Sequence, residues 1–520
     1  MKLHTTRILS FVIALVMMLS MAFTMVACSE EEPSDTPPVN DTPSQETPGE
    51  DKPGENDPGE NDPGENDPET PVNPPENPET PEDPYASYNI PDSLPERSFR
   101  SEGIDEFVIA CQDDMVHYFW VENYDGSIVD NAVFKSVAAV EQRFDVTVSA
   151  YQASGNQAIK NGITTQDGSF DFAFMLDVTA SGFSLENLFT NLYNLDSLDF
   201  SKPWWPAPSI EALTYQGKMF LGSSTMSYLG LGQTFLVYFN KTLFTDIELE
   251  YPYEAVMAGE WYMEDMIELS ENFGYYFGNN DVKDPDDTFG FLCPDGFYGW
   301  FESFGIEMVK KDGDDLILNA HCEEAYELIE NVYYLLHDSD YGYTNSEATV
   351  NEMFSNDQSL FIYGKLRNAY DVFRYHEVDY GILPVPKLNE DQADYHSAYT
   401  DRFFVVPSST VSGKNEQDIG FILEALSAEG YRTIYPAYYE EAMQNRYSTD
   451  AESKQILAML HQYRVIDFSY IYTSGMCFTR ALVTLMIEKQ SKDYASLLAD
   501  GLSQAEAKLV ELENLFAELN

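Results

Sequence analysis

The sequence predicts an α/β protein of two lobes that follows a disordered N-terminal segment. Three observations lead to this fold class. Apolar runs suited to strands alternate with stretches of helical periodicity after residue 103. Residues 85–520 form a globular part that is large for a single hydrophobic core. Residues 29–84, in contrast, contain almost nothing apolar to bury.

The first lobe begins with a repeating order of strand and helix. Residues 106–110 and 171–176 are short apolar runs suited to buried strands, and residues 146–150 form a strand between them. Residues 131–144 have helical spacing, with one apolar face made of Val133, Val137, Val140 and Phe144. This order is typical of a parallel sheet covered by helices. Ligands of such sheets bind at the carboxyl ends of the strands, so the loops after Ala110 and Leu176 are candidate sites.

The C-terminal region is expected to be more helical. Ser503 and Glu506 have the spacing of a capping box, which predicts that a helix begins there. Its apolar face would consist of Ala505, Leu509, Leu512, Phe516 and Leu519. We interpret this face as a packing surface.

The N-terminus has the features of a secretory signal. Lys2 and Arg7 precede an apolar run, residues 11–23. Residues 25–28, Met-Val-Ala-Cys, resemble the bacterial lipobox, in which the cysteine is lipidated. We expect residues 1–27 to be removed and Cys28 to hold the chain on the extracellular face of the cell membrane. An uncleaved signal anchor with an ordinary cysteine is the alternative.

Residues 28–84 are expected to form a tether after the lipidated cysteine. From residue 29 on, this segment holds 15 of the 27 prolines, 19 acidic residues and one basic residue, Lys52. The pentapeptide Pro-Gly-Glu-Asn-Asp occurs three times, from Pro53, Pro58 and Pro63. Mutual repulsion of the charges and the high proline content predict a disordered, extended chain. A polyanionic binding element is the alternative.

Charge limits the possible partners. The formal net charge is −61 at pH 7, with 89 acidic and 28 basic residues. Such a surface repels nucleic acid and anionic lipid headgroups, so neither is an expected partner. A strongly anionic ligand is also disfavoured unless a local pocket reverses the field.

Motifs for cofactors and catalysis are not found in the sequence. Besides Cys28 the cysteines are Cys111, Cys293, Cys322 and Cys477, which have no C-x-x-C spacing. Disulfides between them and buried free thiols both remain open. The seven histidines contain no H-E-x-x-H motif, and there is no G-x-S-x-G elbow or phosphate-binding loop. We therefore expect no metal, no cofactor and no enzymatic activity.

Several segments together resemble a known family. In order along the chain they are Ser-Lys-Pro-Trp-Trp from Ser201, Gly217-Lys218, Val-Tyr-Phe-Asn-Lys from Val237, Gly-Glu-Trp from Gly259, Asp-Tyr-Gly-Ile-Leu-Pro-Val-Pro-Lys from Asp379, Phe-Ile-Leu-Glu-Ala-Leu from Phe421, and Pro-Ala-Tyr-Tyr from Pro436. This series resembles the extracellular solute-binding proteins of ABC importers, family 1, in the branch common among clostridia-like bacteria. Tyr262 and residues 222–224 depart from the family pattern, which puts the inherited ligand specificity in doubt.

The resemblance implies a type II periplasmic-binding-protein-like fold, in which crossing hinge strands join two α/β lobes and solute binds in the cleft between them. By this comparison lobe 1 would comprise residues 103–232 and 382–413. Lobe 2 would comprise residues 233–381 and 415–520. Closure around the solute would produce the shape that the importer recognises.

Five residues are candidates for solute contact. Trp120 and Glu122 lie in the loop after the first strand, and Asp177 follows the strand that ends at Leu176. Trp300 lies in a glycine-broken aromatic loop of the second lobe, and Arg402 could donate hydrogen bonds or form a surface pair with Asp401. The motif tryptophans are interpreted as structural: Trp204, Trp205 and Trp261.

The expected function is capture of an extracellular solute by a monomeric lipoprotein that delivers it to ABC permease subunits. An oligosaccharide or glycoside is the first choice of solute, because the family binds sugars and 14% of the residues are aromatic. A peptide is the second choice. A receptor subunit that presents solute to a membrane sensor is an alternative function, and a surface glycosidase is a further one.

Overall fold

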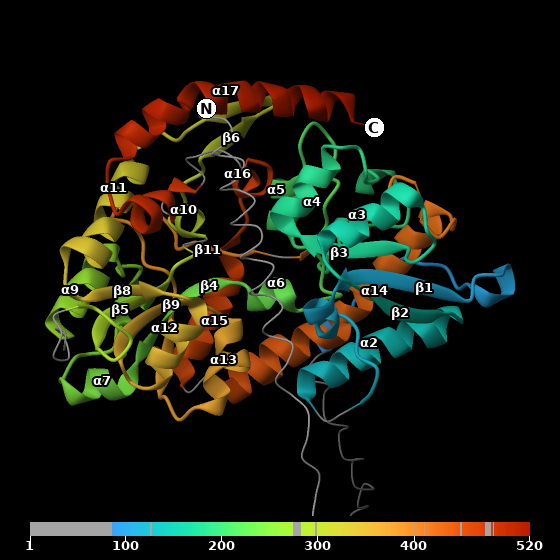
Figure 1. The fold of residues 1–520 in the computed structure, drawn as a ribbon. Helices are drawn as coiled ribbons and strands as arrows, with labels where there is room; N and C mark the ends of the chain where they lie inside the picture. The colour runs from blue at the N-terminus through green and yellow to red at the C-terminus, as the bar shows by residue number, and fades with distance from the viewer. Residues whose placement is uncertain are drawn as a thin grey trace, which may run out of the picture. The chain divides into compact units, whose positions relative to one another are not determined.

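Two larger β-sheets, of four and five strands, organise the folded part of the chain (Figure 1). The computed structural model describes residues 86–519, apart from residues 125–126, 274–281, 297–298, 401, 410, 448–449, 474–479 and 482. The expected signal peptide, Cys28 and the tether lie outside the described residues. Each sheet forms the centre of one lobe.

The sheet of lobe 1 has the strand order β12-β3-β1-β2. The strands β1 (Glu106–Gln112), β2 (Thr147–Ala153) and β3 (Phe172–Leu176) are parallel, with Ile109 beside both Phe172 and Ala150. The last strand, β12 (Arg402–Val405), runs antiparallel to β3. The three strands expected in this region are therefore confirmed, as is their parallel arrangement.

Helix α2 (Ile128–Phe144) begins at Ser127, whose side chain accepts a hydrogen bond from the Asp130 backbone N–H. The predicted apolar face is confirmed, since Val133, Val137, Val140 and Phe144 are all buried. The other helical segments of this lobe are η1 (Ala86–Tyr88), η2 (Arg100–Glu102), η3 (Asp113–Tyr118), α3 (Asn156–Thr165), α4 (Asp177–Ser184), η4 (Leu192–Asn194) and α5 (Ala207–Leu213).

The sheet of lobe 2 has the strand order β10-β4-β9-β5-β8. Its strands are β4 (Phe235–Asn240), β5 (Phe289–Pro294), β8 (Gly342–Asn345), β9 (Ser359–Lys365) and β10 (Tyr380–Leu383). The strand β4 pairs antiparallel with both β9 and β10, whereas β5 is parallel to β8 and β9. The other elements of this lobe are α7 (Lys241–Asp246), α8 (Tyr253–Ala258), α9 (Met263–Phe273), α10 (Trp300–Ser303), β6 (Val309–Asp312), β7 (Asp315–Leu318), α11 (Glu323–Tyr333), η5 (Tyr334–Asp338), α12 (Glu347–Ser355), α13 (Arg367–Asp371) and η6 (Phe373–Tyr375).

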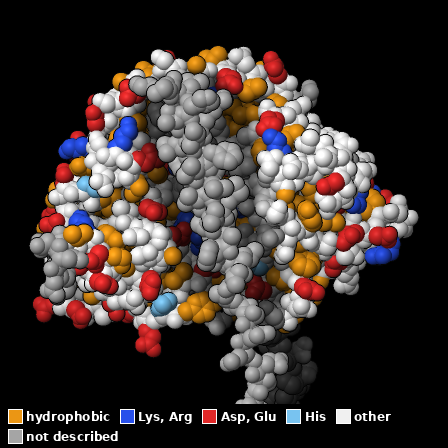
Figure 2. Space-filling model, viewed as in Figure 1, with side chains coloured by type: hydrophobic (Ala, Val, Ile, Leu, Met, Phe, Trp, Pro, Cys, Tyr) orange, Lys and Arg blue, Asp and Glu red, His pale blue; other side chains and the backbone are white. Residues whose placement is uncertain are grey.

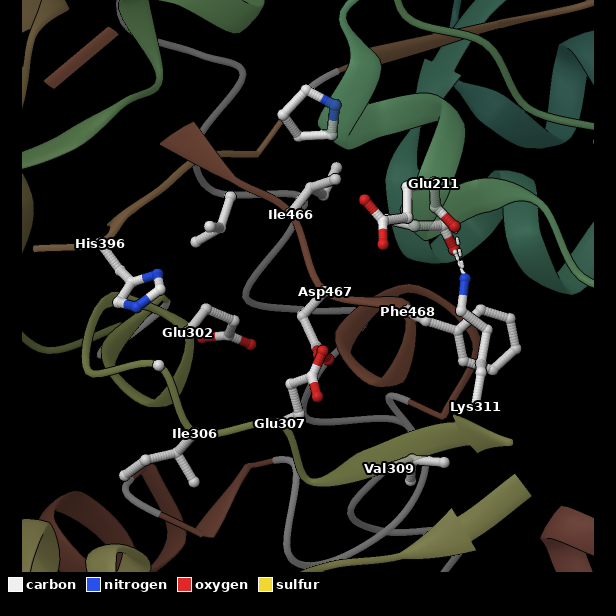
Figure 3. A pocket seen from close by; sticks show the side chains of 14 residues that line it. Glu211, Glu302, Ile306, Glu307, Val309, Lys311, His396, Ile466, Asp467 and Phe468 are labelled. Carbon is white, nitrogen blue, oxygen red and sulfur yellow. Dashed lines mark hydrogen bonds between the residues drawn. The ribbon is translucent and has the colours of Figure 1, made fainter. Parts of the chain in front are cut away.

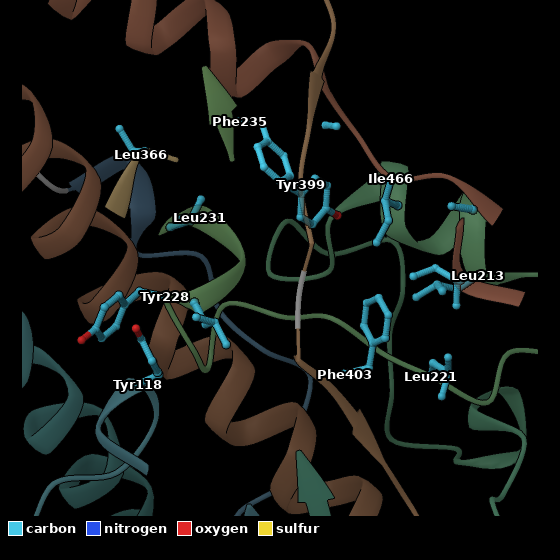
Figure 4. Close-up of a cluster of buried hydrophobic side chains, with 14 of the residues drawn as sticks. Tyr118, Leu213, Leu221, Tyr228, Leu231, Phe235, Leu366, Tyr399, Phe403 and Ile466 are labelled. Atoms are coloured by element: carbon cyan, nitrogen blue, oxygen red, sulfur yellow. The ribbon is translucent and has the colours of Figure 1, made fainter. Parts of the chain in front are cut away.

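Two chain segments cross between the lobes side by side. The first leaves lobe 1 after Gly222, which bridges to Phe404, and passes through α6 (Leu229–Gly232) into β4. The second returns through β11 (Ser397–Ala398) to β12, and Thr234 bridges to Tyr399 where the two segments meet. Figure 4 shows buried side chains from both segments at this crossing, with the Tyr399 and Phe235 rings next to each other. The crossing arrangement implied by the family resemblance is thus present.

The lobe boundaries differ from those expected at two places. Ile382 and Leu383, expected in lobe 1, are hydrogen-bonded to β4 in the sheet of lobe 2. Helix α14 (Glu416–Pro436), expected in lobe 2, packs on α2 of lobe 1 instead. Its apolar side chains, including Phe421, contact Phe99 and Phe144 of that lobe. The third connection between the lobes therefore runs through η7 (Ala437–Tyr447) to α15 (Ala451–Gln462), which packs on β10.

The last helix, α17 (Tyr494–Glu518), follows β13 (Arg464–Val465), α16 (Phe468–Tyr472) and η8 (Val483–Lys489). The prediction that it begins at Ser503 is wrong. The carboxylate of Asp493 accepts a hydrogen bond from the Ser496 N–H at 3.0 Å and caps the helix ten residues before Ser503. The predicted apolar face is confirmed, because all five of its side chains are buried.

The motif tryptophans are structural, as predicted. Trp204 and Trp205 are buried, and both indole N–H groups donate to the carboxylate of Glu424, at 3.1 and 3.0 Å. Trp261 is also buried and donates to the Pro384 carbonyl at 3.2 Å. The segment from Ser201 and the segment from Phe421, both part of the family resemblance, thus meet in the interior, because Glu424 of α14 accepts from both indoles.

The described cysteines are free thiols. Cys111 and Cys293 are buried and Cys322 is half-buried, while Cys477 lies outside the described residues. Within the described part of the chain, no helix combines the length and apolarity needed to cross a bilayer. Acidic side chains are scattered over the visible face of both lobes (Figure 2).

Candidate functional site

The candidate site lies where the strand ends of the two lobes approach each other. On lobe 1, β3 ends at Leu176 and α4 begins at Asp177. Arg402 begins β12 directly opposite Leu176 in the antiparallel register. The topology therefore brings Asp177 and Arg402 together, although 225 residues separate them in the sequence.

Asp177 is only 2% exposed. Burial raises the pKa of its carboxyl to about 6, against the opposing effects of the Val178 N–H, the Arg402 charge and a hydrogen bond with Tyr470. The Val178 N–H donates to Asp177 Oδ1 at 2.7 Å. Helix α16 packs on α4 and supplies Tyr470, so Asp177 is covered and holds neighbouring groups in place.

The lobe 2 side of the site is a cavity of about 220 Å³ at the ends of β4, β5 and β9. Phe235 and Lys365 lie directly opposite each other in the register of β4 and β9. The residues that line the cavity are Phe235, Pro294, Asp295, Gly296, Glu347, Tyr363, Gly364 and Lys365.

Glu347 is the acidic centre of this cavity. Its carboxylate lies 3.2 Å from Lys365 Nζ and 3.1 Å from Arg367 Nη2. Burial alone would raise the pKa of Glu347, but the two cations outweigh burial and lower it. Burial also lowers the pKa of Lys365. The negative charge of Glu347 acts to raise this pKa, whereas the positive charge of Arg402 lowers it further. Arg402 of lobe 1 thus lies within electrostatic reach of Lys365 of lobe 2.

Other contacts join the same edges of the lobes. Ser127 Oγ and Tyr370 Oη, from different lobes, are 3.1 Å apart. Arg367 is also hydrogen-bonded to Tyr118, which follows β1. We call the whole arrangement the interlobe site; it comprises Asp177 and Arg402 from lobe 1 with Phe235, Asp295, Glu347, Tyr363, Lys365 and Arg367 from lobe 2.

Three acids and three cations balance each other in the interlobe site, which distinguishes it from the strongly acidic chain as a whole. The Tyr363 ring stacks on Phe235 at 5.3 Å between centroids. Hydroxyl groups of a solute could donate to Asp295 and Glu347, which line the cavity, and accept from the cations, while a sugar ring packs on an aromatic face. A neutral polar solute fits this chemistry better than a charged one.

Two of the five predicted contact residues, Asp177 and Arg402, lie together in the interlobe site; Asp401 lies outside the described residues. Trp300 is 1% exposed and stacks on Tyr363 at 4.6 Å, so it lies behind the cavity wall. The Trp120 indole N–H donates to the Val148 carbonyl at 2.9 Å, which ties it to β2, and Glu122 is exposed in the same loop. β2 is two strands away from β3 in the sheet.

The lobe 2 residues of the interlobe site were not predicted. Asp295 follows the buried run of residues 289–294. Lys365 follows the buried run of residues 359–364. The rule that ligands bind after parallel strands, applied to those runs as well as to lobe 1, identifies both residues.

A second cavity, of about 250 Å³, contains an acidic cluster. Figure 3 shows Glu302, Glu307 and Asp467 pointing toward one another, with His396 at the side. Burial raises the pKa of Glu302 to about 8, with a further contribution from Asp467, whose own pKa burial raises to about 6. Burial thus favours the neutral forms of Glu302 and Asp467, and we assign the cluster no ligand.

Comparisons with known proteins give a fold and no sequence family. No family model matches the chain, and no curated protein matches it.

Among solved structures, the chain is similar to an ABC substrate-binding protein from Listeria monocytogenes in complex with cycloalternan. The identity is 13%, the match covers 79% of this chain and 99% of that one, and the TM-score is 0.52. A cyclo/maltodextrin-binding protein complexed with maltotetraose gives 15% identity, coverage of 78% and 97%, and a TM-score of 0.52. UgpB from Mycobacterium tuberculosis, in complex with glycerophosphocholine, gives 12% identity, coverage of 79% and 99%, and a TM-score of 0.52. The chain therefore has the two-lobe periplasmic-binding-protein fold.

Proposed function

We propose that this chain is a solute-binding lipoprotein that captures an oligosaccharide or glycoside outside the cell and delivers it to an ABC importer. The observation that carries the proposal is the interlobe site, in which balanced charges and aromatic rings lie at the strand ends of a two-lobe fold. Such a site offers both donors and acceptors to the hydroxyl groups of a neutral sugar.

The structural neighbours support this choice of solute. Two of them are described in complex with cycloalternan and maltotetraose, which are carbohydrates. UgpB is described with glycerophosphocholine, so the same fold also accepts other small polar solutes. Carbohydrate remains first because the interlobe site has no excess of either charge.

Anchoring through Cys28 would place the folded part at the cell surface, beyond the acidic tether. Multiple acyl chains on one residue are needed for lasting attachment, and a lipidated N-terminal cysteine supplies them. Closure of the lobes around solute would then present a distinct shape to permease subunits. We expect the chain to act as a monomer in this role.

Calorimetric titration of residues 29–520 against maltotetraose, cyclic glucans, peptides and glycerophosphodiesters tests the proposal. We expect saturable binding of at least one oligosaccharide without product formation. Thermal unfolding gives an independent measure, because ligand at a hundred times its Kd adds ~2.7 kcal/mol to the free energy of unfolding. Response to peptides alone would contradict the sugar assignment, and turnover of a glycan would indicate a glycosidase.

A matched pair of variants locates the binding. Asp295→Asn removes an acceptor from the interlobe cavity and should weaken the sugar roughly tenfold, the typical effect of losing a charged hydrogen bond. Asp391→Asn makes the same change at an exposed position outside that cavity and should leave affinity unchanged. Equal effects of the two substitutions would place the sugar elsewhere.

A further inference from the structure

A third cavity, of about 510 Å³, lies beside the crossing segments and is separate from the interlobe site. Its walls come from residues 200–208, from residues 223–231 of the first crossing, from Tyr399 of the second crossing, and from α14, the end of α15 and β13. None of its lining residues lines the interlobe cavity. We call it the crossing pocket.

The charge of the crossing pocket is opposite to that of the protein. Among the described residues that line it there is no aspartate or glutamate, whereas Lys202 and Arg464 both face it. The whole chain carries a formal net charge of −61. Acidic residues adjoin the wall from outside, since Glu440 accepts from Tyr88 Oη at 2.6 Å and Glu424 accepts from Trp205. The crossing pocket therefore carries positive charge in a protein whose net charge is negative.

Arg464 is the most informative residue of the crossing pocket. It is 8% exposed, its Nη2 donates to the Gly230 carbonyl at 2.6 Å, and its guanidinium carbon lies 3.9 Å from the centroid of the Tyr399 ring. Its Nε–H, in contrast, has no hydrogen-bond partner. A buried, charged donor without an acceptor is costly, and this Nε is itself closed off from solvent. Arg464 also lines the pocket, so a bound anion would stabilise the guanidinium charge without reaching Nε.

The rest of the wall suits a ring with hydroxyl groups. The aromatic side chains are Tyr88, Phe200, Trp205, Tyr399, Tyr431 and Tyr435. Three serines and a threonine, residues 223–225 and 227, also line the pocket, and the Thr225 hydroxyl donates to the Ser427 carbonyl at 2.8 Å. His461 Nε2 lies 2.7 Å from Tyr435 Oη, and burial together with Arg464 lowers the His461 pKa to about 4. This histidine is therefore neutral at pH 7 and adds hydrogen bonding without charge.

We propose that the crossing pocket binds a small anionic sugar of the uronic acid class, with its carboxylate at Arg464 and its ring on the aromatic wall. One buried guanidinium and one half-buried ammonium match a single carboxylate. The interlobe site, with equal numbers of acids and cations, lacks this preference. The two sites would hence select different solutes. The proposal for the crossing pocket does not depend on the proposal for the interlobe site.

Titration of residues 29–520 with glucuronate, at low ionic strength and pH 7, tests the proposal, with glucose as the neutral comparator. Glucuronate should bind measurably more tightly than glucose. The substitution Arg464→Gln should weaken glucuronate roughly tenfold or more, as expected for loss of a charge-assisted hydrogen bond. Lys202→Gln should weaken it less, and Lys508→Gln, an equal charge change at a half-exposed position of α17 outside the pocket, should have no effect.

Two further measurements distinguish a loss of folding from a loss of the binding site. If Arg464→Gln fails to fold, Lys202→Gln decides, because this side chain is half-exposed and donates a long hydrogen bond of 3.4 Å to the Pro91 carbonyl. Asp295→Asn should leave glucuronate binding unchanged while it weakens a neutral oligosaccharide. Equal affinity for glucose and glucuronate, or glucuronate binding that both pocket variants retain, would overturn the proposal whatever the fate of the sugar in the interlobe site.

Discussion

At the scale of single residues, two buried carboxylates show how different surroundings act on the same group. Glu347 lies between Lys365 and Arg367, which lower its pKa. Glu424 has no ion pair within the described part of the chain and accepts from two indoles, so burial raises its pKa to about 7. These two side chains should therefore change protein stability with pH in opposite directions.

We predict that Glu347→Gln destabilises the protein most at neutral pH. The substitution leaves Lys365 and Arg367 without their shared acid, and buried unpaired cations are costly. Because the pKa of Glu347 is lowered on folding, its contribution is present above the unfolded pKa and disappears as pH falls through the folded value. Thermal unfolding at pH 7 and at pH 4 should show a gap in Tm between wild type and variant that shrinks in acid. A gap that does not change with pH would contradict this account.

The opposite trend is expected for Glu424→Gln. A raised carboxyl pKa favours the folded state below the unfolded pKa, and this contribution is lost as pH rises through about 7. A shift from near 4.5 to about 7 corresponds to on the order of 3 kcal/mol. Relative to the variant, wild type should lose Tm between pH 5 and pH 8. The exposed Glu122→Gln serves as the control and should show no such trend.

At the scale of elements, helix α17 is attached to different lobes at its two ends. Tyr494 near its start donates to the Ala320 carbonyl at 2.8 Å and packs on Tyr326 in lobe 2. Phe516 near its end packs on Tyr215 and Phe220 of lobe 1, at centroid distances of 5.1 and 5.9 Å. A 25-residue helix spans roughly 37 Å, which is long enough to bridge both lobes (Figure 1).

Phe516→Ala should remove most of the attachment of α17 to lobe 1. The side chain is fully buried, and truncation of a buried phenylalanine typically costs about 3–5 kcal/mol. Chemical denaturation should show this loss, and hydrogen exchange should increase in the last two turns of the helix. Val510→Ala, on the exposed face of the same helix, is the matched control and should change stability little. Similar losses for the two variants would mean that α17 is held elsewhere.

At the scale of the whole molecule, the proposed function depends on keeping a strongly acidic binding module at the membrane surface. In that proposal Cys28 is the attachment point, and the proline-rich, acidic residues 29–84 follow it.

We predict that Cys28→Ala releases the protein from the membrane. Without the cysteine no lipid can be attached, and within the described part of the chain no helix could replace it. Cell fractionation should find wild type in the detergent phase and the variant in the medium or in an unprocessed membrane form. Cys111→Ala is the control, because that thiol is buried in the core of lobe 1. Retention of a processed Cys28→Ala chain at the membrane would contradict lipid anchoring.

Much of the fold could be predicted because it depends on local patterns. The runs at residues 106–110 and 171–176 are apolar because both faces of their sheet are covered, and the face of α2 follows from the 3.6-residue period. The start of α17 could not be predicted so simply. Ser503 and Glu506 have the spacing of a capping box, yet Asp493 forms the observed cap, since tertiary packing of Tyr494 and Leu497 extends the helix toward the N-terminus.

The sequence by itself determined the alternation of strands and helices and the acidic character of the chain, because these follow from residue types and short spacings. Solute contact by Asp177 and Arg402 stays a prediction. Only the tertiary structure decided which side chains share a site. Lys365 faces Phe235 because β4 lies beside β9, and Arg464 reaches the crossing pocket because β13 pairs with β11. Strand order and long-range pairing depend on the free energy of the whole fold, and no local segment of the sequence contains that information.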